Sequence, residues 1–319
     1  MTSKLVKRVQ SIRELERAWR AIQENARSSK SDNVRREVEK FAENSGRRVH
    51  SICARLARGS FKFMPAKGIP IPKTDNDGKR SKTSFRPIVL APLESRIVQR
   101  SILEVLMSHK AMQKYVNTPH SFGGVRRQKG KEIAAVPAAV YAVLQAIGGR
   151  GQQLGGGAKF VALADISKFF TRIPKTAVRN IISSAIEDNE FMALFDEAVK
   201  VELSNMAELR EKAAQFPVED IGVAQGNSLS PLLGNILLFE FDALMNEGDC
   251  RCIRYIDDFI ILAPTKKAAA ARLKKAKRLL GALQMELSPE KSSKEPSPVD
   301  APFVFLGIEF ANGFIRPSG

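Results

Sequence analysis

The clearest hydrophobic pattern in the chain is a pair of short apolar runs, Cys252-Ile253 and Phe259–Ala263, on either side of Arg254-Tyr255-Ile256-Asp257-Asp258. Apolar, β-prone runs with no spare residues between them are typical of a tight β-hairpin. The pattern therefore predicts a hairpin with Asp257 and Asp258 at its bend. Aspartate is also common in ordinary turns, so this stretch alone leaves a purely structural bend open.

Helical spacing of apolar residues dominates the N-terminal part of the chain. It predicts amphipathic helices over residues 11–27 and 32–58, the second starting at Ser31-Asp32 and ending at Gly59. The polar face of the second helix is strongly basic and is either a solvated face or one that binds phosphates. Its basic residues are Arg35, Arg36, Lys40, Arg47 and Arg48.

Further apolar runs predict the remaining elements. Strands are expected near residues 69–73 and 86–90, around a turn at 75–78, and at 160–166 and 303–310, the last followed by the hairpin signal Asn312-Gly313. Helices are expected over residues 94–109, 134–147, 174–187, 231–245 and 266–283, with a further helical stretch to about residue 215. The order from residue 160 onward predicts an α+β fold, an antiparallel sheet with helices on one face.

The charge of the chain bears on its partners. The chain has 319 residues and a formal net charge of +17, and its basic residues are spread along it. A folded chain this basic most simply binds nucleic acid, although a basic surface that only keeps the protein solvated is the alternative. The patch expected to contact nucleic acid holds Arg126, Arg127, Lys129 and Lys131.

Cysteine usage and hydropathy bear on location. Cys250 and Cys252 are too close for a usual zinc-binding spacing, so all three cysteines are expected to be reduced thiols. No apolar run approaches the length of a membrane span, and the N-terminal residues lack an apolar stretch of the signal-peptide type. The sequence therefore predicts a cytoplasmic protein without a membrane partner.

Acidic residues at the ends of predicted strands are the strongest candidates for chemistry. Asp165 ends the strand at 160–166, and the bend of the hairpin holds Asp257 and Asp258. In an antiparallel sheet these three carboxylates can meet at one edge. Such a cluster favours Mg²⁺, which prefers hard oxygen ligands. Two ions about 4 Å apart can clamp the attacking and leaving oxygens of a phosphoryl displacement.

A series of short motifs runs through residues 60–310: Ile71-Pro72-Lys73, Arg86-Pro87-Ile88, Arg96–Gln99, His120–Gly123, Asp165–Phe170, Gln225–Pro231, Tyr255–Asp258, Leu287–Lys291 and Phe305–Gly307. In order and spacing this series resembles that of bacterial reverse transcriptases of the group II intron-like and retron-like branch, most of all the free-standing enzymes associated with defence.

The resemblance implies a polymerase right-hand fold. It places an N-terminal helical extension at residues 1–59, the fingers at 60–158 and the palm at 159–319, with fingers and palm interleaved around 120–158. The thumb expected after the palm is largely absent from this chain. The role of the thumb is then expected to fall to a second protein, to a bound RNA or to nothing.

The resemblance also implies roles for the matching residues. Asp165, Asp257 and Asp258 are catalytic and, with the backbone carbonyl of Ile166, hold two Mg²⁺ ions. The residues implied to bind the incoming deoxynucleoside triphosphate are Lys73, Arg86, Phe170, Gln225, Gly226 and Lys291. In this set Lys73 and Arg86 meet the triphosphate, Phe170 is a steric gate against the 2′-hydroxyl, and Lys291 is a candidate general acid for pyrophosphate. Surface charge and core packing are the structural alternatives for these residues.

Departures from the family's pattern bear on which branch of the family the chain resembles. Ala224 stands where the family usually has proline, and Ile256 takes the variable position of the Tyr-x-Asp-Asp motif. Phe305-Leu306-Gly307 argues against a retron, which usually carries Val-Thr-Gly there. Ser230-Pro231 argues against a diversity-generating element, in which this motif typically ends Ser-Gln.

The leading hypothesis is an RNA-directed DNA polymerase that copies a dedicated structured non-coding RNA into cDNA in anti-phage defence. Its partners are then the RNA template, the cDNA product and deoxynucleoside triphosphates. One alternative is untemplated or protein-primed DNA synthesis by an enzyme of the abortive-infection type. The other is a non-catalytic RNA-binding scaffold that keeps the palm only as a fold.

Overall fold

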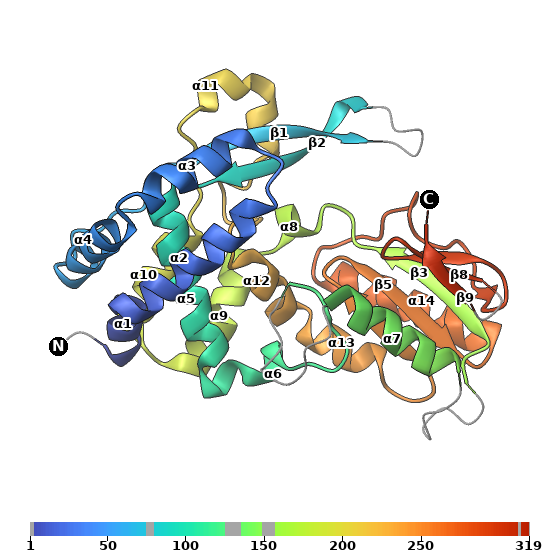
Figure 1. The fold of residues 1–319 in the computed structure, drawn as a ribbon. Helices are drawn as coiled ribbons and strands as arrows, with labels where there is room; N and C mark the ends of the chain where they lie inside the picture. The colour runs from blue at the N-terminus through green and yellow to red at the C-terminus, as the bar shows by residue number, and fades with distance from the viewer. Residues whose placement is uncertain (1–2, 75–79, 125–134, 149–156, 312–313, 319) are drawn as a thin grey trace. The chain divides into compact units, whose positions relative to one another are not determined.

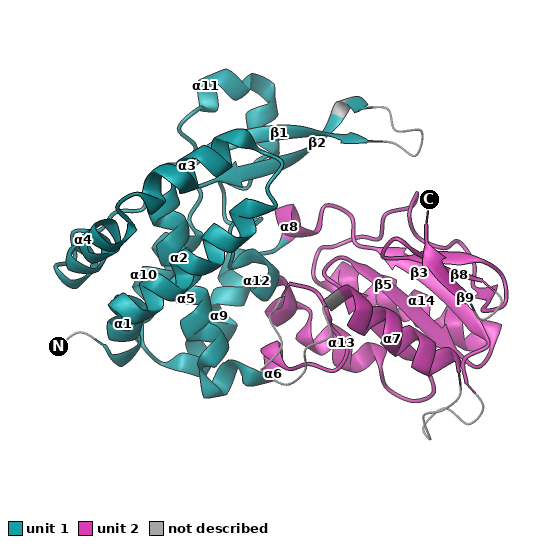
Figure 2. Ribbon diagram, viewed as in Figure 1, with its two compact units in different colours: residues 1–113, 173–233 teal, residues 114–172, 234–319 magenta. Residues whose placement is uncertain are grey.

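The computed structural model describes residues 3–74, 80–124, 135–148, 157–311 and 314–318 (Figure 1). The chain forms two compact units, unit 1 from residues 1–113 and 173–233 and unit 2 from residues 114–172 and 234–319 (Figure 2). This division differs from the predicted extension, fingers and palm, and those boundaries stay a prediction. In the part of the chain that the structure describes, no helix combines the length and apolar character needed to cross a membrane.

Unit 1 is mainly helical. Its helices are α1 (Lys4–Val9), α2 (Ile12–Arg27), α3 (Asp32–Ala42), α4 (Ser45–Ala57), α5 (Leu93–Ser108), α9 (Lys175–Ile186), α10 (Asn189–Val199), α11 (Met206–Leu209) and the first half of α12 (Ser230–Leu237), with 3-10 turns η1 (Lys110–Met112) and η2 (Arg210–Gln215). Helix α5 is buried along most of its length, because α1, α2 and α10 pack against it.

The prediction of one continuous helix over residues 32–58 is wrong. Helix α3 ends at Ala42, and Asn44 leaves the helical conformation with φ −136° as the N-cap of α4. Asparagine is a common N-cap residue, although the Asn44 side chain makes no capping hydrogen bond here.

The strands predicted around residues 69–73 and 86–90 are confirmed. Strand β1 (Lys67–Thr74) pairs antiparallel with β2 (Arg80–Leu90), and Ile71 lies opposite Arg86. The register shifts between Pro72 and Thr74, so Lys73 lies at an irregularity of the ladder. The turn predicted at residues 75–78 lies outside the described residues.

Unit 2 is built on an antiparallel sheet, as predicted. Its four strands are hydrogen-bonded in the order β4-β5-β3-β6, and a three-stranded sheet has the order β7-β8-β9. The strands are β3 (Phe160–Asp165), β4 (Arg251–Tyr255), β5 (Asp258–Ala263), β6 (Ser297–Pro298), β7 (Phe303–Phe305), β8 (Ile308–Ala311) and β9 (Phe314–Pro317). The helices are α6 (Gln113–Val116), α7 (Ala135–Ile147), α8 (Phe169–Arg172), α13 (Phe239–Met245) and α14 (Lys266–Ala282).

Alternation along the strands gives the four-stranded sheet two buried faces. On one face Ala263 packs against Ala269 of α14, and Phe259 contacts Phe241 of α13 with ring centroids 5.5 Å apart. These helices confirm the predicted α+β layer. On the other face Ile260 and its neighbours pack against α7 and the β7-β8 hairpin, a layer that the prediction did not include.

Two predicted elements are divided in the structure. The helix predicted over residues 231–245 is two helices, α12 and α13, with Leu238 between them. The strand predicted over 303–310 is a hairpin, because Leu306 and Gly307 both adopt positive φ, at 52° and 75°. Two successive left-handed residues form the tight turn that suits a hairpin. The strands on either side of Asn312-Gly313 pair as that signal predicts, while those two residues lie outside the described ones.

Candidate active site

Three aspartates lie together at one end of the unit 2 sheet. Strands β3 and β5 pair with Asp165 directly opposite Asp258, and Asp257 precedes Asp258 in the turn. The backbone nitrogen of Ile166 donates a hydrogen bond of 2.9 Å to the carbonyl oxygen of Asp257, which ties the turn to the end of β3. The predicted hairpin is confirmed, with the bend at Ile256-Asp257 rather than at the two aspartates.

The electrostatics of this cluster oppose full ionisation. Burial, together with the negative charges of Asp257 and Asp165, raises the pKa of Asp258 to about 7. Burial and the charge of Asp165 also raise the pKa of Asp257. Neighbouring carboxylates disfavour each other's ionised form, because both would carry a negative charge. The cluster therefore holds more negative charge than its surroundings neutralise.

One cation meets the cluster directly. The Nζ atom of Lys291 donates a hydrogen bond of 2.9 Å to Oδ2 of Asp165. Desolvation lowers the pKa of Lys291, but the hydrogen bond and the charges of the three aspartates outweigh it and raise that pKa. A lysine was predicted at this site by resemblance, and the structure brings it to Asp165.

The segment that carries Lys291 runs along β3. Ser293 and Leu163 exchange hydrogen bonds, with the Leu163 nitrogen donating to Ser293 Oγ at 2.9 Å and the Ser293 nitrogen donating to the Leu163 carbonyl at 2.8 Å. The nitrogen of Ser288 donates to the carbonyl of Asp165 at 2.8 Å. These bonds fix the segment, and hence the Lys291 backbone, next to the carboxylate cluster.

A buried ion pair next to the turn supports its backbone. The guanidinium of Arg254, which is 0% exposed, pairs with Asp242 of α13 through Nε at 2.8 Å and Nη2 at 2.6 Å. Its remaining Nη1 donates to the carbonyl of Ile256 at 2.8 Å. Ile256 has φ +60°, an uncommon conformation for a β-branched residue. Arg254 therefore binds the turn at its strained residue.

A second support approaches the turn from residues 121–123. Ser121 Oγ donates to Asn235 Oδ1 at 3.0 Å, and Asn235 Nδ2 donates to the carbonyl of Gly123 at 3.2 Å. A Cβ on Gly123 would lie 2.7 Å from Cγ1 of Ile256 and 2.9 Å from its nitrogen, so only glycine fits against the turn. Sequence reasoning missed Arg254, Asp242 and Asn235 as supports. The available signal was Arg254, a charged residue directly after the apolar pair Cys252-Ile253.

No group of three or more His, Cys, Asp or Glu side chains is arranged as a ready-made metal site within the described ranges. The chemistry of the aspartate cluster nevertheless fits divalent cations. Carboxylate oxygens are the ligands that Mg²⁺ prefers. Burial and the negative charges of Asp257 and Asp165 raise the pKa of Asp258, and a bound cation would offset those charges.

The residues expected to bind the triphosphate are mostly in unit 1. Lys73 and Arg86 are exposed on β1 and β2. The Val89 nitrogen donates to the carbonyl of Gln225 at 2.8 Å, which ties the Gln225-Gly226 loop to the strand of Arg86. Gly226 has φ +122°, and a Cβ there would lie 2.6 Å from the Val89 carbonyl oxygen. The structure therefore brings this loop and β2 together, and their contact with a nucleotide stays a prediction.

Two further predictions concern unit 2. Phe170 lies in α8, half-buried beside Phe169 with ring centroids 5.3 Å apart. Its role as a steric gate stays a prediction. The basic residues expected to contact nucleic acid, Arg126, Arg127, Lys129 and Lys131, lie outside the described residues.

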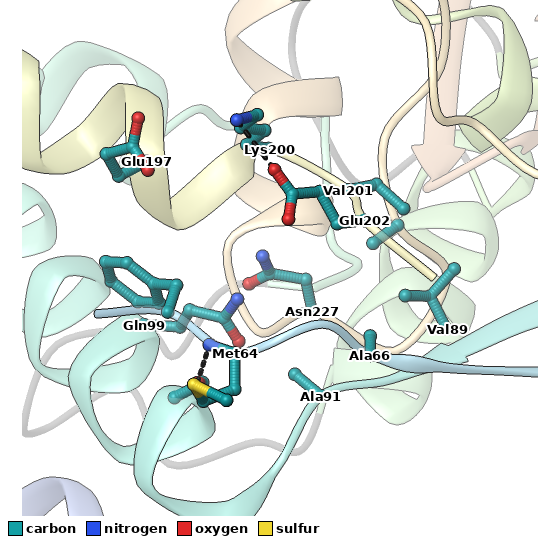
Figure 3. Close-up of a pocket in the computed structure, with 13 residues that line it drawn as sticks. Met64, Ala66, Val89, Ala91, Gln99, Glu197, Lys200, Val201, Glu202 and Asn227 are labelled. Atoms are coloured by element: carbon teal, nitrogen blue, oxygen red, sulfur yellow. Dashed lines mark hydrogen bonds and ion pairs between the residues drawn. The ribbon is translucent and has the colours of Figure 1, made fainter. Parts of the chain in front are cut away.

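Unit 1 also holds a small recess next to the Gln225-Gly226 loop (Figure 3). The side-chain amides of Gln99 and Asn227 both donate to the carbonyl of Ala198, each at 3.0 Å. Gln99 is only 6% exposed, and its Oε1 has no hydrogen-bond partner among the described residues. This recess was not predicted from the sequence.

Residues 71–310 match the family described as reverse transcriptase (RNA-dependent DNA polymerase). Protein YkfC of Escherichia coli (strain K12) is 26% identical over 289 residues, which cover 79% of this chain and 68% of that protein.

Two solved structures show the extent of the similarity in fold. Apo telomerase from Candida tropicalis aligns with a TM-score of 0.51 and 13% identity, over 80% of this chain and 49% of the telomerase chain. A partial Cas6-RT-Cas1–Cas2 complex aligns with a TM-score of 0.44 and 16% identity, over 89% of this chain and 43% of that chain. The chain thus spans about half the length of these solved chains.

The family match covers most of the chain and includes the aspartate cluster, the Gln225-Gly226 loop and the Lys291 segment. The predicted enzyme class, a nucleotidyltransferase, agrees with it. The chain belongs to the reverse transcriptases, the family of RNA-dependent DNA polymerases.

Proposed function

We propose that this protein copies a dedicated structured non-coding RNA into cDNA by nucleotidyl transfer at Asp165, Asp257 and Asp258. One observation carries the proposal: Asp165 faces Asp258 across β3 and β5, Asp257 lies in the adjoining turn, and Lys291 binds Asp165. A carboxylate cluster at the end of a sheet, in a chain of net charge +17, suits a reaction between polyanions.

Each of the three aspartates has a place in this chemistry. Together with the backbone carbonyl of Ile166 they would hold two Mg²⁺ ions, which would activate the primer 3′-hydroxyl and offset the charge of the triphosphate. The raised pKa values of Asp257 and Asp258 favour uptake of a cation, because a bound cation replaces the missing counter-charge.

The remaining residues act on the substrates directly in this proposal. Arg86 and Lys73 bind oxygens of the triphosphate, with Arg86 able to pair in a bidentate way. Phe170 excludes the 2′-hydroxyl of ribonucleotides, and the Gln225-Gly226 loop brings backbone close to the nucleotide. Lys291 holds Asp165 in the free enzyme and is the candidate proton donor to pyrophosphate.

The test is primer extension by purified protein with its co-purifying RNA in the presence of Mg²⁺. Asp257→Asn is expected to lower the rate about 10³-fold, because several kcal/mol of charge stabilisation are removed. Asp300→Asn, an exposed aspartate of the same unit, is the matched control and should leave the rate unchanged. Full activity of Asp257→Asn would show that the site is assigned wrongly.

Sequencing of the co-purifying nucleic acid separates this function from its alternatives. One abundant RNA with complementary DNA supports templated synthesis and identifies the template. DNA without a complement supports untemplated or protein-primed synthesis. RNA that never yields DNA, even with deoxynucleotides and Mg²⁺, supports a scaffold. A role in anti-phage defence is proposed from the family resemblance, and loss of protection in cells carrying Asp257→Asn would test it.

A further inference from the structure

Unit 1 carries a groove that the proposed chemistry does not use. It has a volume of about 490 Å³ and is lined by residues of α3 and α4, the segment that follows them, and the start of α5. This size is typical of ligand sites, which range over about 300–1,000 Å³. We refer to it as the helical groove, and its lining includes Lys40, Phe41, Arg48, Arg55, Lys62 and Met64.

The helical groove is positively charged. Its two carboxylates already have partners: Glu94 pairs with Arg55 at 2.5 Å, and Glu37 pairs with Arg96. Lys40, Arg48 and Lys62 form no ion pair with any carboxylate that the structure describes. Cations that converge on a groove without counter-charges attract a polyanion, and phosphates of a nucleic acid are the simplest source.

The groove also offers surfaces on which a base can stack. The guanidinium carbon of Arg48 lies 5.3 Å from the ring centroid of Phe41, and that ring is fixed against Trp19 with centroids 4.6 Å apart. The cation–π contact holds the guanidinium of Arg48 in place. Met64 is 60% exposed, which is unusual for a large apolar side chain. Single-stranded RNA is recognised by stacking of its bases on aromatic and guanidinium planes.

The small recess of Figure 3 adjoins the helical groove, since Met64 and Ser95 line both. Its volume of about 40 Å³ admits a few water molecules or a hydroxyl group but no base. The Oε1 atom of the buried Gln99 has no partner among the described residues and is available to accept a hydrogen bond there. RNA carries a 2′-hydroxyl donor on each nucleotide and DNA does not, which favours RNA as the ligand.

We propose that the helical groove binds a single-stranded segment of RNA, with its phosphates on Lys40 and Lys62 and a base against Arg48 and Met64. The inference rests on the proposed function for the source of the RNA, which would be the enzyme's own template. It adds a binding site on the N-terminal helices, separate from the aspartate cluster. The site would keep the RNA attached to the enzyme independently of synthesis.

The experiment measures binding of a labelled single-stranded RNA, and of DNA of the same sequence, at several salt concentrations. The test variant is Lys40→Glu with Lys62→Glu, both at exposed positions. The control is Lys4→Glu with Lys7→Glu, exposed lysines of α1 in the same unit that produce the same change in net charge. Circular dichroism and thermal unfolding check that both variants fold.

The groove variant is expected to lose RNA affinity about tenfold or more. Its salt dependence should weaken by a slope of about 1.4, since each single-strand phosphate contact contributes about 0.7. The control should stay within about twofold of the wild type, and Asp257→Asn should retain RNA binding while losing synthesis. Thiouridine-labelled RNA should crosslink to the peptide that contains Met64, which locates the site without any substitution.

Four results would overturn the proposal. Equal losses in the groove and control variants would mean that only total charge matters. Unchanged affinity of the groove variant, or a crosslink elsewhere, would remove the site. Equal affinity of the wild type for RNA and DNA would overturn the commitment to RNA. Failure of Asp257→Asn to lose synthesis would count against the proposed function and leave the groove intact.

Discussion

Replacing Arg254 with methionine is expected to destabilise the protein strongly and to slow synthesis. The substitution leaves Asp242, which is 2% exposed, as a buried charge without its partner. Breaking a buried ion pair from one side costs about 3–5 kcal/mol. The carbonyl of Ile256 also loses its donor, which adds about 1 kcal/mol. Domains are stable by about 5–15 kcal/mol in total, so this loss is a large share.

The measurement is urea unfolding of four proteins: wild type, Arg254→Met, Asp242→Leu and the double variant. The double variant removes both charges and is expected to be more stable than either single variant, with a coupling energy of about 3 kcal/mol or more. As a control, Arg316→Met breaks the exposed pair with Glu309 and should cost less than about 1 kcal/mol.

Primer extension by the same proteins separates the effect of Arg254 on the stability of the fold from its effect on the position of the turn. The double variant still lacks the donor to the Ile256 carbonyl, so its kcat should fall below that of the wild type at a temperature where it is folded, with KM nearly unchanged. Two outcomes would refute the reasoning: a cost of less than about 1 kcal/mol for Arg254→Met, or additive losses in the double variant. Wild-type kcat in the folded double variant would restrict Arg254 to a structural role.

Three other predictions concern Gly123, Gly226 and Asp258. Gly123→Ala should lower kcat with little effect on RNA affinity, because its Cβ would lie 2.7 Å from Cγ1 of Ile256; steady-state kinetics and RNA binding measure the two quantities. Gly226→Ala should cost about 1–3 kcal/mol in urea unfolding, since φ is +122° and the Cβ would lie 2.6 Å from a backbone carbonyl. Mg²⁺ should raise the Tm of the metal-free protein most above pH 7, where Asp258, with a pKa of about 7, is ionised; a Tm independent of Mg²⁺ would contradict the metal assignment.

The parts of the fold that could be predicted from the sequence depend on local patterns. Short apolar runs located β1, β2 and β3, and the two runs around Asp257 located the β4-β5 hairpin. Once those strands are antiparallel neighbours, the register brings Asp165 opposite Asp258. The cluster could therefore be predicted, because each of its aspartates lies at the end of an apolar run that forms a strand.

The parts that could not be predicted depend on contacts between distant residues. The ion pair of Arg254 with Asp242 joins a strand to a helix, and neither residue indicates its partner by spacing. The breaks at Asn44 and Leu238 interrupt apolar patterns that continue at helical spacing. At Leu306-Gly307 a glycine within an apolar run was the signal of a turn, because glycine adopts positive φ without strain.

Several features of the turn at Asp257 reduce the stability of the fold. Such features gathered in one place are expected in an active site, so they favour an enzyme over a scaffold. Ile256 has a strained φ, and the pKa of Asp258 is raised to about 7 by burial and by neighbouring charge. Between the ordinary pKa of 3.8 and pH 7 the folded protein retains a proton that the unfolded chain releases, so stability falls as the pH rises through this window.

Asp258→Asn removes this effect and should stabilise the metal-free protein at pH 8 while leaving its stability near pH 3 almost unchanged. The same substitution should abolish primer extension, as expected where stability is given up for activity. Thermal unfolding of both proteins across this pH range, without metal, measures the difference. A variant that is less stable than the wild type at pH 8 would show that Asp258 supports the fold, and a scaffold would then explain the cluster equally well.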